Sequence, residues 1–199
     1  MEYRQTLPID EAVVRRLHVG DILYLSGPVF TARDAAHHLM LERFEAGQPV
    51  PFDPSKMGLF HCGPIVRHRK DGWQLVAAGP TTSIRMEPFE ARFLETFRPR
   101  IIIGKGGMGP QTQAALQTTG AVYAHYTGGA GALAARSVTQ IKAVHWLDPL
   151  GMPEAVWVFD MRNFGPLLVT MDSHGASLYE QLEPTIAENM KRLLAHIAE

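Results

Sequence analysis

The stretch from residue 101 to residue 126 most constrains how this chain can fold. Ile101, Ile102 and Ile103 form a β-branched run without polar alternation, which is typical of a parallel strand buried on both faces. A glycine-rich loop follows at 104–109, and Pro110–Thr119 has the composition of a helix with proline at its start. Residues 121–126 are the next strand. This order predicts a right-handed parallel βα unit and an α/β fold.

The glycine-rich loop raises an alternative function. Gly104, Gly106 and Gly109 match the G-x-G-x-x-G fingerprint of dinucleotide-binding domains. That fingerprint requires an acidic residue about 20 positions further on, to bind a ribose hydroxyl. Residues 124–127 contain no acid, and the lysine does not follow the last glycine as a P-loop requires. A nucleotide- or anion-binding regulatory module using residues 104–109 therefore stays as an alternative.

Lys105 lies inside this loop, at the carboxyl end of a predicted parallel strand. Ligands of α/β proteins bind at such strand ends, so we expect Lys105 to point into a site. The alternative is that the glycines only make a sharp turn and that Lys105 is solvated.

A second connection, residues 79–85, also has the composition of an anion site. Thr81, Thr82 and Ser83 place three hydroxyls beside the free N–H groups of a predicted helix start, and Arg85 adds a positive charge. The alternative is that Thr82 or Ser83 only caps the helix.

Arg33 is the third cation on a predicted strand-to-helix connection. The helix dipole disfavours an arginine in the first helical turn by roughly 0.3 to 1 kcal/mol, which a bound anion or Asp34 would offset. Arg33, Arg85 and Lys105 beside hydroxyl groups suit a small dicarboxylate, because a guanidinium can bind a carboxylate with two parallel hydrogen bonds.

We expect the chain, residues 1–199, to form one domain, with an extended N-terminal arm and an amphipathic C-terminal helix that docks on the body or meets a partner. An Asp-Gly pair at Asp71 and Gly72 predicts a hairpin. The expected elements are an arm at 1–20, a strand at 22–25, a helix from Thr31 or Asp34 to about Gly47, hairpin strands at 65–69 and 73–78, a helix at 86–97, strands at 141–146, 155–160 and 167–171, and the C-terminal helix within 176–199.

Composition excludes several functions. The formal net charge of −1 gives no electrostatic footprint for nucleic acid or for an anionic membrane. No segment has the ~18 uninterrupted apolar residues of a membrane span, so we expect a cytoplasmic protein. Cys62 is the only cysteine, which excludes an intrachain disulfide and an iron–sulfur cluster held by this chain alone.

The histidines do not have the pattern of a metal site. His37 and His38 are adjacent on a predicted helix and point to different faces, so a satisfied or surface histidine is the preferred interpretation, and we expect no metal bound by this chain. The same holds for His125, His145 and His174. Asp172, Ser173 and His174 are not a catalytic triad, because consecutive residues in a turn cannot relay one proton in line. The roles of His38, His61 and Cys62 stay open.

Four segments together resemble one known family. Residues 31–37, 79–86, 105–108 and 151–155 occur in the order and spacing of the class I fumarase and L(+)-tartrate dehydratase group. The resemblance runs from about Gly20 to Tyr179. The chain is similar to the β subunit, which is equivalent to the C-terminal domain of the single-chain enzymes.

This resemblance implies a swivelling β/β/α domain and an oxygen-sensitive hydro-lyase. It implies that a [4Fe–4S] cluster is held by cysteines of an α subunit, in an α2β2 assembly that is active only with both subunits. Fumarate hydration to malate is the main expectation, and L(+)-tartrate dehydration is the alternative. A scaffold without activity is a third possibility, which intact Thr81, Arg85 and Lys105 argue against.

The resemblance also implies residue roles. Arg33, Arg85 and Lys105, with Thr82, would bind the substrate carboxylates, and Thr81 would transfer the proton with its hydroxyl activated by the neighbouring cations and the helix start. Asp34, a second catalytic candidate, and His37 would orient Arg33. Ser83, Gly106 and Gly107 would support the site.

Overall fold

The structure is a computed structural model that describes residues 1–70 and 72–197. Asp71 of the predicted hairpin turn and residues 198–199 of the predicted C-terminal segment lie outside the described residues. The strands are β1 (Glu2–Thr6), β2 (Ile22–Thr31), β3 (Gly58–Phe60), β4 (Ile65–Arg69), β5 (Gly72–Ala77), β6 (Ile101–Gly104), β7 (Val122–His125), β8 (Val138–His145) and β9 (Val156–Met171).

The helices alternate with these strands over much of the chain, as expected of an α/β protein. They are α1 (Glu11–Val14), α2 (Asp34–Glu45), the 3₁₀ helices η1 (Pro54–Lys56) and η2 (Ser83–Met86), α3 (Glu87–Phe97), α4 (Pro110–Thr119), α5 (Gly131–Arg136), α6 (Leu147–Leu150) and α7 (Leu178–Ile197).

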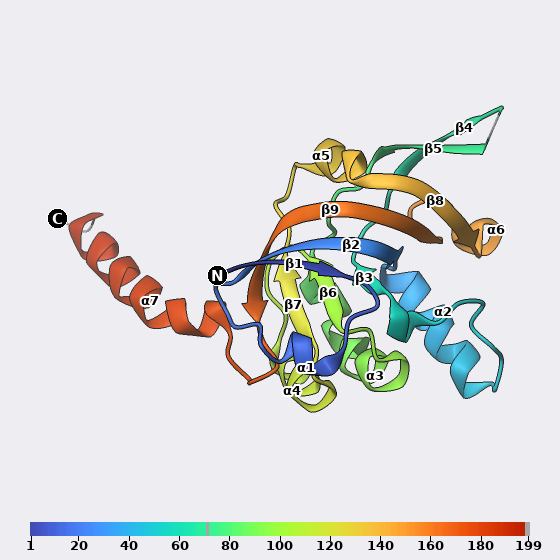
Figure 1. Cartoon of the computed structure of the whole chain (residues 1–199). Coiled ribbons are helices and arrows are strands. Elements are labelled where there is room, and N and C mark those ends of the chain that lie inside the picture. Colours follow the sequence, from blue (N-terminus) through green and yellow to red (C-terminus); the bar gives the residue numbers. More distant parts are fainter. Residues whose placement is uncertain (71, 198–199) are drawn as a thin grey trace.

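One mixed sheet organises the molecule. Its strand order is β1-β2-β3-β6-β7-β9-β8, and β9 pairs with β2 as well, so the pairings β2-β3-β6-β7-β9 close on themselves (Figure 1). The strands β1, β2, β3, β6 and β7 run parallel, whereas β9 is antiparallel to its neighbours. The α/β class is confirmed, and β6, α4 and β7 form the predicted parallel unit with Ile101 opposite Val122.

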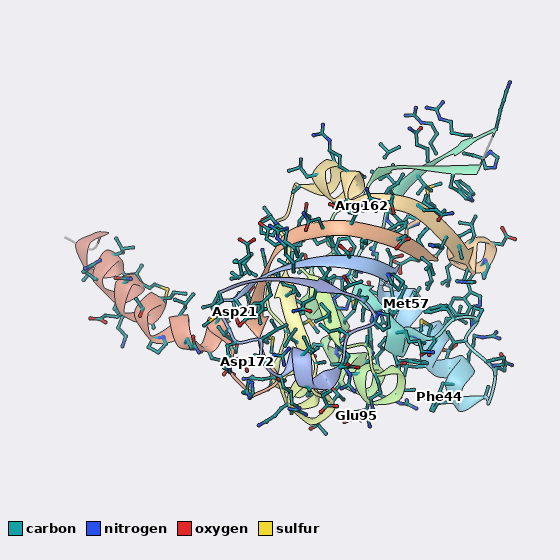
Figure 2. All side chains as sticks on the ribbon, viewed as in Figure 1. Asp21, Phe44, Met57, Glu95, Arg162 and Asp172 are labelled. Atoms are coloured by element: carbon teal, nitrogen blue, oxygen red, sulfur yellow. The ribbon has the colours of Figure 1, made fainter. Side chains whose placement is uncertain are left out.

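Apolar residues of the sheet point alternately to two core clusters. Ile101 and Ile103 belong to a cluster shared with the base of β4 and β5, whereas Ile102 belongs to a cluster shared with α2, α3 and α4. A strand has a side-chain period of two, so three consecutive isoleucines fill both faces. Side chains accordingly crowd both sides of the sheet (Figure 2).

Two predicted segments differ from the structure. The expected arm at 1–20 contains β1, which pairs in parallel with β2, and buries Leu7, Val14 and Leu17. The two predicted strands at 155–160 and 167–171 are one strand, β9. Residues 161–166, which lie between the two predicted strands, continue the strand, and a register shift of β9 against β2 accommodates the irregularity there, with Asn163 at a φ of 54°.

The parallel strands place the candidate site. Their carboxyl ends meet at one edge of the sheet, where an α/β fold binds its ligands. Arg33 follows β2, His61 follows β3, Lys105 follows β6, and His125 ends β7. Three residues from distant parts of the sequence, Arg33, His61 and Lys105, therefore lie at the same edge.

Helix α7 leaves the body of the molecule. The ribbon points away from the sheet, and its side chains stand apart from the packed core (Figures 1 and 2). Leu182, Ile186, Met190 and Leu193 are exposed by 46 to 61%. None of the helices in the described ranges has the length and apolar character needed to span a membrane.

Candidate active site

The segment 79–85 is joined to the edge of the sheet by backbone contacts. Pro80 forms an isolated antiparallel bridge with Cys62, and Thr82 forms a parallel bridge with Lys105. The Thr81 N–H donates to the His61 carbonyl at 2.7 Å, and the Ser83 N–H donates to the Lys105 carbonyl at 3.0 Å. The threonines therefore lie between the ends of β3 and β6, beside Lys105.

The hydroxyl groups of this segment do not cap a helix. Thr82 is the N-cap residue of η2 and Met86 that of α3, and neither side chain makes a capping hydrogen bond. Ser83 is buried and bonds to other side chains. Within the described residues, the Thr81 hydroxyl makes no hydrogen bond to another side chain or to the backbone. The capping alternative is therefore not realised, and the Thr81 hydroxyl is available to a ligand.

Both predicted arginines carry a carboxylate partner. Arg85 Nη2 donates to Asp34 Oδ2 at 2.7 Å, in a pair whose arginine side chain is 50% exposed. Arg33 Nε lies 3.1 Å from Glu154 Oε1. Asp34 was expected to orient Arg33, but it contacts Arg85 instead. Lys105 forms no ion pair within the part of the chain that the structure describes.

Glu154 is a site residue that the sequence reasoning missed. Its Oε2 accepts a hydrogen bond from the Ala35 N–H at 3.1 Å, so one carboxylate serves both Arg33 and the first turn of α2. It is the anion that an arginine at a helix start requires. Glu154 lies in the motif at 151–155, which was the available signal.

Gly63 gives the Arg33 side chain its space. A Cβ at Gly63 would lie 2.8 Å from Arg33 Nη1 and 2.8 Å from the Pro153 carbonyl oxygen. Both distances are too short for a real side chain, so any larger residue would displace the guanidinium. The position of Arg33 therefore depends on β2, on the 151–155 motif and on the chain after β3.

The glycines of the 104–109 loop make room for protein groups. A Cβ at Gly104 would overlap the Ser83 hydroxyl, and one at Gly107 would lie 2.9 Å from a ring carbon of Tyr179. A Cβ at Gly109 would lie 2.5 Å from Glu87 Oε1. Gly106 has a φ of +73°, which favours glycine.

Glu87 occupies the helix start that a nucleotide phosphate would need. Its Oε2 accepts from the Gly109 N–H at 2.7 Å, and its Oε1 accepts from the Gln111 and Thr112 N–H groups at 3.0 and 3.3 Å. A dinucleotide places its pyrophosphate on these N–H groups. The carboxylate therefore disfavours the nucleotide-binding alternative.

A polar cluster lies buried beneath the candidate site. His37, His61 and Glu90 are each 0% exposed, and both His37 Nε2 and His61 Nε2 lie near Glu90 Oε2, at 3.2 and 3.3 Å. Burial acts to raise the pKa of Glu90, but the two imidazole rings outweigh it and hold the pKa well below its usual value. The three side chains are also close enough to hold a metal ion.

This cluster corrects the interpretation of the histidines. His37 is buried and His38 exposed, as expected of neighbours on a helix, but His37 contacts the Arg33 backbone rather than its guanidinium. His61 is part of the cluster. Glu90 was missed, although it stands four residues after Met86 and three before Phe93, on the apolar face of α3. An acid at a core position of an amphipathic helix was the signal.

The other candidate residues have structural partners. Asp172 accepts hydrogen bonds from the N–H groups of Val19 and His174, so its carboxylate does not face the His174 ring. Cys62 is 1% exposed, and burial raises the pKa of its thiol far above the usual range. A single enclosed thiol does not fit an iron–sulfur cluster, which needs several thiolate ligands.

The comparison with known sequences decides the family. Residues 4–182 match the sequence model described as "Fumarase C-terminus". The chain belongs to the fumarase C-terminus family. A putative L(+)-tartrate dehydratase subunit beta of Methanocaldococcus jannaschii is 43% identical over 181 residues, which cover 91% of this chain and 93% of the relative.

Two further relatives extend this match within the fumarase C-terminus family. The L(+)-tartrate dehydratase subunit beta of Escherichia coli strain K12 is 40% identical over 194 residues, 98% of this chain and 94% of the relative. A putative class I fumarate hydratase of Geobacillus stearothermophilus is 38% identical over 186 residues, which are 93% of this chain but 35% of that protein. The family resemblance drawn from the four motifs is confirmed.

Proposed function

We propose that this chain is the β subunit of a hydro-lyase that adds or removes water across a carbon–carbon bond of a small dicarboxylate. The observation that carries this proposal is the gathering of Arg33, Arg85, Lys105 and the available Thr81 hydroxyl at one edge of the sheet. The named subunits and the fumarate hydratase among its relatives support it.

In this proposal the cations bind the substrate carboxylates. The Asp34–Arg85 pair is largely exposed, and exposed ion pairs contribute only about 0 to 1 kcal/mol, so a substrate carboxylate can replace Asp34 on Arg85 at little cost. Arg33 keeps Glu154, which holds the guanidinium in place. Lys105 offers a charge that has no carboxylate partner among residues 1–70 and 72–197. Thr82 lies beside Lys105 and adds a hydroxyl.

Thr81 is the proposed proton-transfer residue. A neutral hydroxyl is a weak base, so the role requires the nearby cations to favour its deprotonated form. Asp34 would act on the site through Arg85. Ser83, Gly106 and Gly107 are supporting residues, because they set the spacing between the threonine segment and the lysine loop.

The remaining half of the site is proposed to come from a partner subunit. An open hollow of about 350 Å³ adjoins Gly79 and Pro80, and no charged side chain lines it. The Arg85 side chain is 50% exposed, so this cation is open to a substrate or a partner. We propose that a partner α subunit covers this edge and holds the [4Fe–4S] cluster, since Cys62 cannot. An α2β2 stoichiometry and a cytoplasmic location stay predictions.

The substrate is one of two diacid types. Relatives named for tartrate dehydration match nearly the whole chain, and a relative named for fumarate hydration matches as well. Both substrates are four-carbon dicarboxylates, so the same three cations serve either. We therefore propose a four-carbon dicarboxylate, either fumarate and malate or L(+)-tartrate.

Anaerobic reconstitution tests this function. The purified chain is mixed with a cluster-loaded α-type subunit, and turnover of fumarate, malate and L(+)-tartrate is measured with the chain alone and with the mixture. We expect turnover only in the mixture, and Thr81→Ala should abolish most of it while assembly persists. Thr118→Ala, an exposed change on α4, is the matched control. Full activity of the single chain would contradict the proposal.

A further inference from the structure

The buried cluster continues into a connected set of hydrogen bonds. His61 Nδ1 lies 2.9 Å from the Ser83 hydroxyl, which lies 2.9 Å from the Tyr123 hydroxyl. The Tyr123 hydroxyl also lies 3.0 Å from the Gly106 carbonyl oxygen. At the other end, His37 Nδ1 lies 2.8 Å from the Arg33 carbonyl oxygen. We call His37, His61, Glu90, Ser83 and Tyr123 the polar hub.

The hub connects the segments that carry the candidate site. It ends on the backbone of Arg33 at one side and on that of Gly106, next to Lys105, at the other. Ser83 lies two residues from both Thr81 and Arg85 and next to Thr82. All five proposed substrate-contacting positions are therefore within two residues of a hub contact.

Hydrogen-bond chemistry assigns one proton of His37. A carbonyl oxygen only accepts hydrogen bonds, so the contact with the Arg33 carbonyl places a proton on Nδ1. His37 Nε2 and His61 Nε2 both approach the same oxygen of Glu90 in the protein interior, at 3.2 and 3.3 Å. The two rings hold the pKa of Glu90 well below its usual value in spite of its burial, so its carboxylate is ionised. The centre of the hub is therefore a buried carboxylate between two imidazole rings.

Stability alone does not account for this arrangement. Replacing a buried ion pair by apolar residues of similar volume is often neutral or stabilising, because desolvation offsets the attraction between the charges. The surrounding cluster is apolar, with Phe93 packed on the His37 ring at 4.4 Å between centroids. Gly104, moreover, leaves the space that the Ser83 hydroxyl occupies.

We propose that Glu90, His37 and His61 are positioning residues, and that their buried charged contacts hold the Arg33, Thr81 and Lys105 segments in register for the substrate. The kinetic part of this inference rests on the proposed function. The contact of Glu90 with both imidazole rings does not, because it concerns the chain by itself. Ser83 and Tyr123 connect His61 to the Gly106 carbonyl oxygen and so help to fix the position of the loop that carries Lys105.

Nitrogen-15 NMR of the histidine rings in the isolated full chain tests the geometry of the hub. We expect His37 Nδ1 to carry a proton, because it lies 2.8 Å from the Arg33 carbonyl oxygen. Glu90→Gln should shift the ring signals of both His37 and His61, because both rings lose the carboxylate that they share. Glu87→Gln, on the same helix, is the matched control and should leave the His37 signals unchanged. An unprotonated Nδ1 in the wild-type chain, or equal signals in Glu90→Gln and in the control, would overturn the proposed contacts.

Kinetics of the assembled enzyme test the positioning role. We expect Glu90→Gln to lower kcat/KM roughly 10²-fold, with a raised KM, because displaced cations bind the dicarboxylate less well. Glu90→Asp keeps the charge and should recover part of the loss. A purely structural role would reduce the amount of folded enzyme and leave KM unchanged, and that result would overturn the proposal.

Two further measurements test the contacts of the hub and its alternative as a metal site. Ser83→Ala removes one hydroxyl with little change in packing, so it should alter the His61 signals and leave those of His37 in place. Metal analysis of the purified chain distinguishes the hub from a metal site. One bound metal ion per chain in the wild type that is lost in Glu90→Gln would overturn the proposal. If the wild-type mixture shows no hydro-lyase turnover, the proposed function fails, while the NMR result still decides whether Glu90 contacts both imidazole rings.

Discussion

Two regions of this protein place side chains against their ordinary preference. The polar hub buries a carboxylate and two imidazole rings completely, whereas α7 exposes Ile186 and Leu193 by 60 and 61%. The hub finds its partners within the chain, on α2, α3 and the strand ends. The apolar stripe of α7 finds none among the described residues. We propose from this difference that the hub acts within this chain, on the segments of the candidate site, and that the exposed stripe of α7 is a surface for another chain.

The polar hub and the start of α7 both contact the loop 104–109, which carries Lys105. Tyr179, near the start of α7, packs where Gly107 has no side chain, and Gly106 accepts from Tyr123 of the hub. The loop that carries Lys105 is therefore held by the Tyr123 hydroxyl at Gly106 and by the Tyr179 ring of the first turn of α7 at Gly107. A partner bound to α7 would lie close to the proposed site.

The largest expected effect comes from breaking the hub. Glu90→Gln should lower the free energy of unfolding by about 3 to 5 kcal/mol at neutral pH, because it removes the buried carboxylate that two buried imidazole rings share. The folded-state pKa of Glu90 lies below its usual value of 4.5, so its stabilisation is present above that pH and is lost as the pH falls through the folded-state pKa. Urea unfolding from neutral to acid pH should show the difference between wild type and variant shrinking in acid.

Replacing apolar residues of the α7 stripe should weaken the binding of a partner by a smaller free energy and leave the fold of this chain unchanged. Ile186→Gln with Leu193→Gln removes two apolar anchors, each worth about 1 to 2 kcal/mol at an interface, so affinity for the α-type partner should fall roughly 100-fold. Sedimentation of the mixed subunits measures it.

Phe44→Gln is the matched control for α7, because Phe44 is 56% exposed near the end of α2, away from the edge that the partner is proposed to cover (Figure 2). It should leave assembly unchanged. Equal assembly by the α7 variant and this control would show that the stripe is not the partner surface.

The smallest expected effect comes from Glu87, whose carboxylate caps the start of α4. Glu87 accepts from the first N–H groups of α4, so Glu87→Gln should lower the free energy of unfolding by about 1 kcal/mol. Thermal unfolding measures this loss. Glu95→Gln, an exposed change on the same helix, should leave the melting temperature unchanged. If Glu87→Gln lowered the free energy of unfolding as much as Glu90→Gln, the difference between the buried hub and the carboxylate at the start of α4 would be contradicted.

Local sequence patterns predicted the elements near the site well. The isoleucine run, Pro110 and the period of α7 identified β6, α4 and α7, because burial on both faces, a helix start and amphipathicity are local properties. Thr81, Arg85 and Lys105 could be selected as candidate site residues because each lies on a connection between elements that has an unusual composition.

Contacts between distant residues were not predictable from these patterns. Asp34 faces Arg85 and Glu154 faces Arg33, and a single sequence does not specify which carboxylate reaches which guanidinium. The continuity of β9 through residues 161–166 was missed, because its pairing with β2 joins residues far apart in the sequence. Glu90 was recognisable only as an acid on an apolar helix face, and its partners come from α2 and the end of β3.

The most direct test of the central claim is the kcat/KM of the assembled enzyme for its dicarboxylate in Arg85→Lys, with Arg92→Lys as control. Lysine keeps the charge but loses the two parallel hydrogen bonds to a carboxylate. Arg92 pairs with Glu45 and is 58% exposed on α3, away from the strand ends. We predict a roughly 10²-fold loss for Arg85→Lys and none for Arg92→Lys. Equal kcat/KM values in the two variants would contradict a dicarboxylate site at this edge of the sheet.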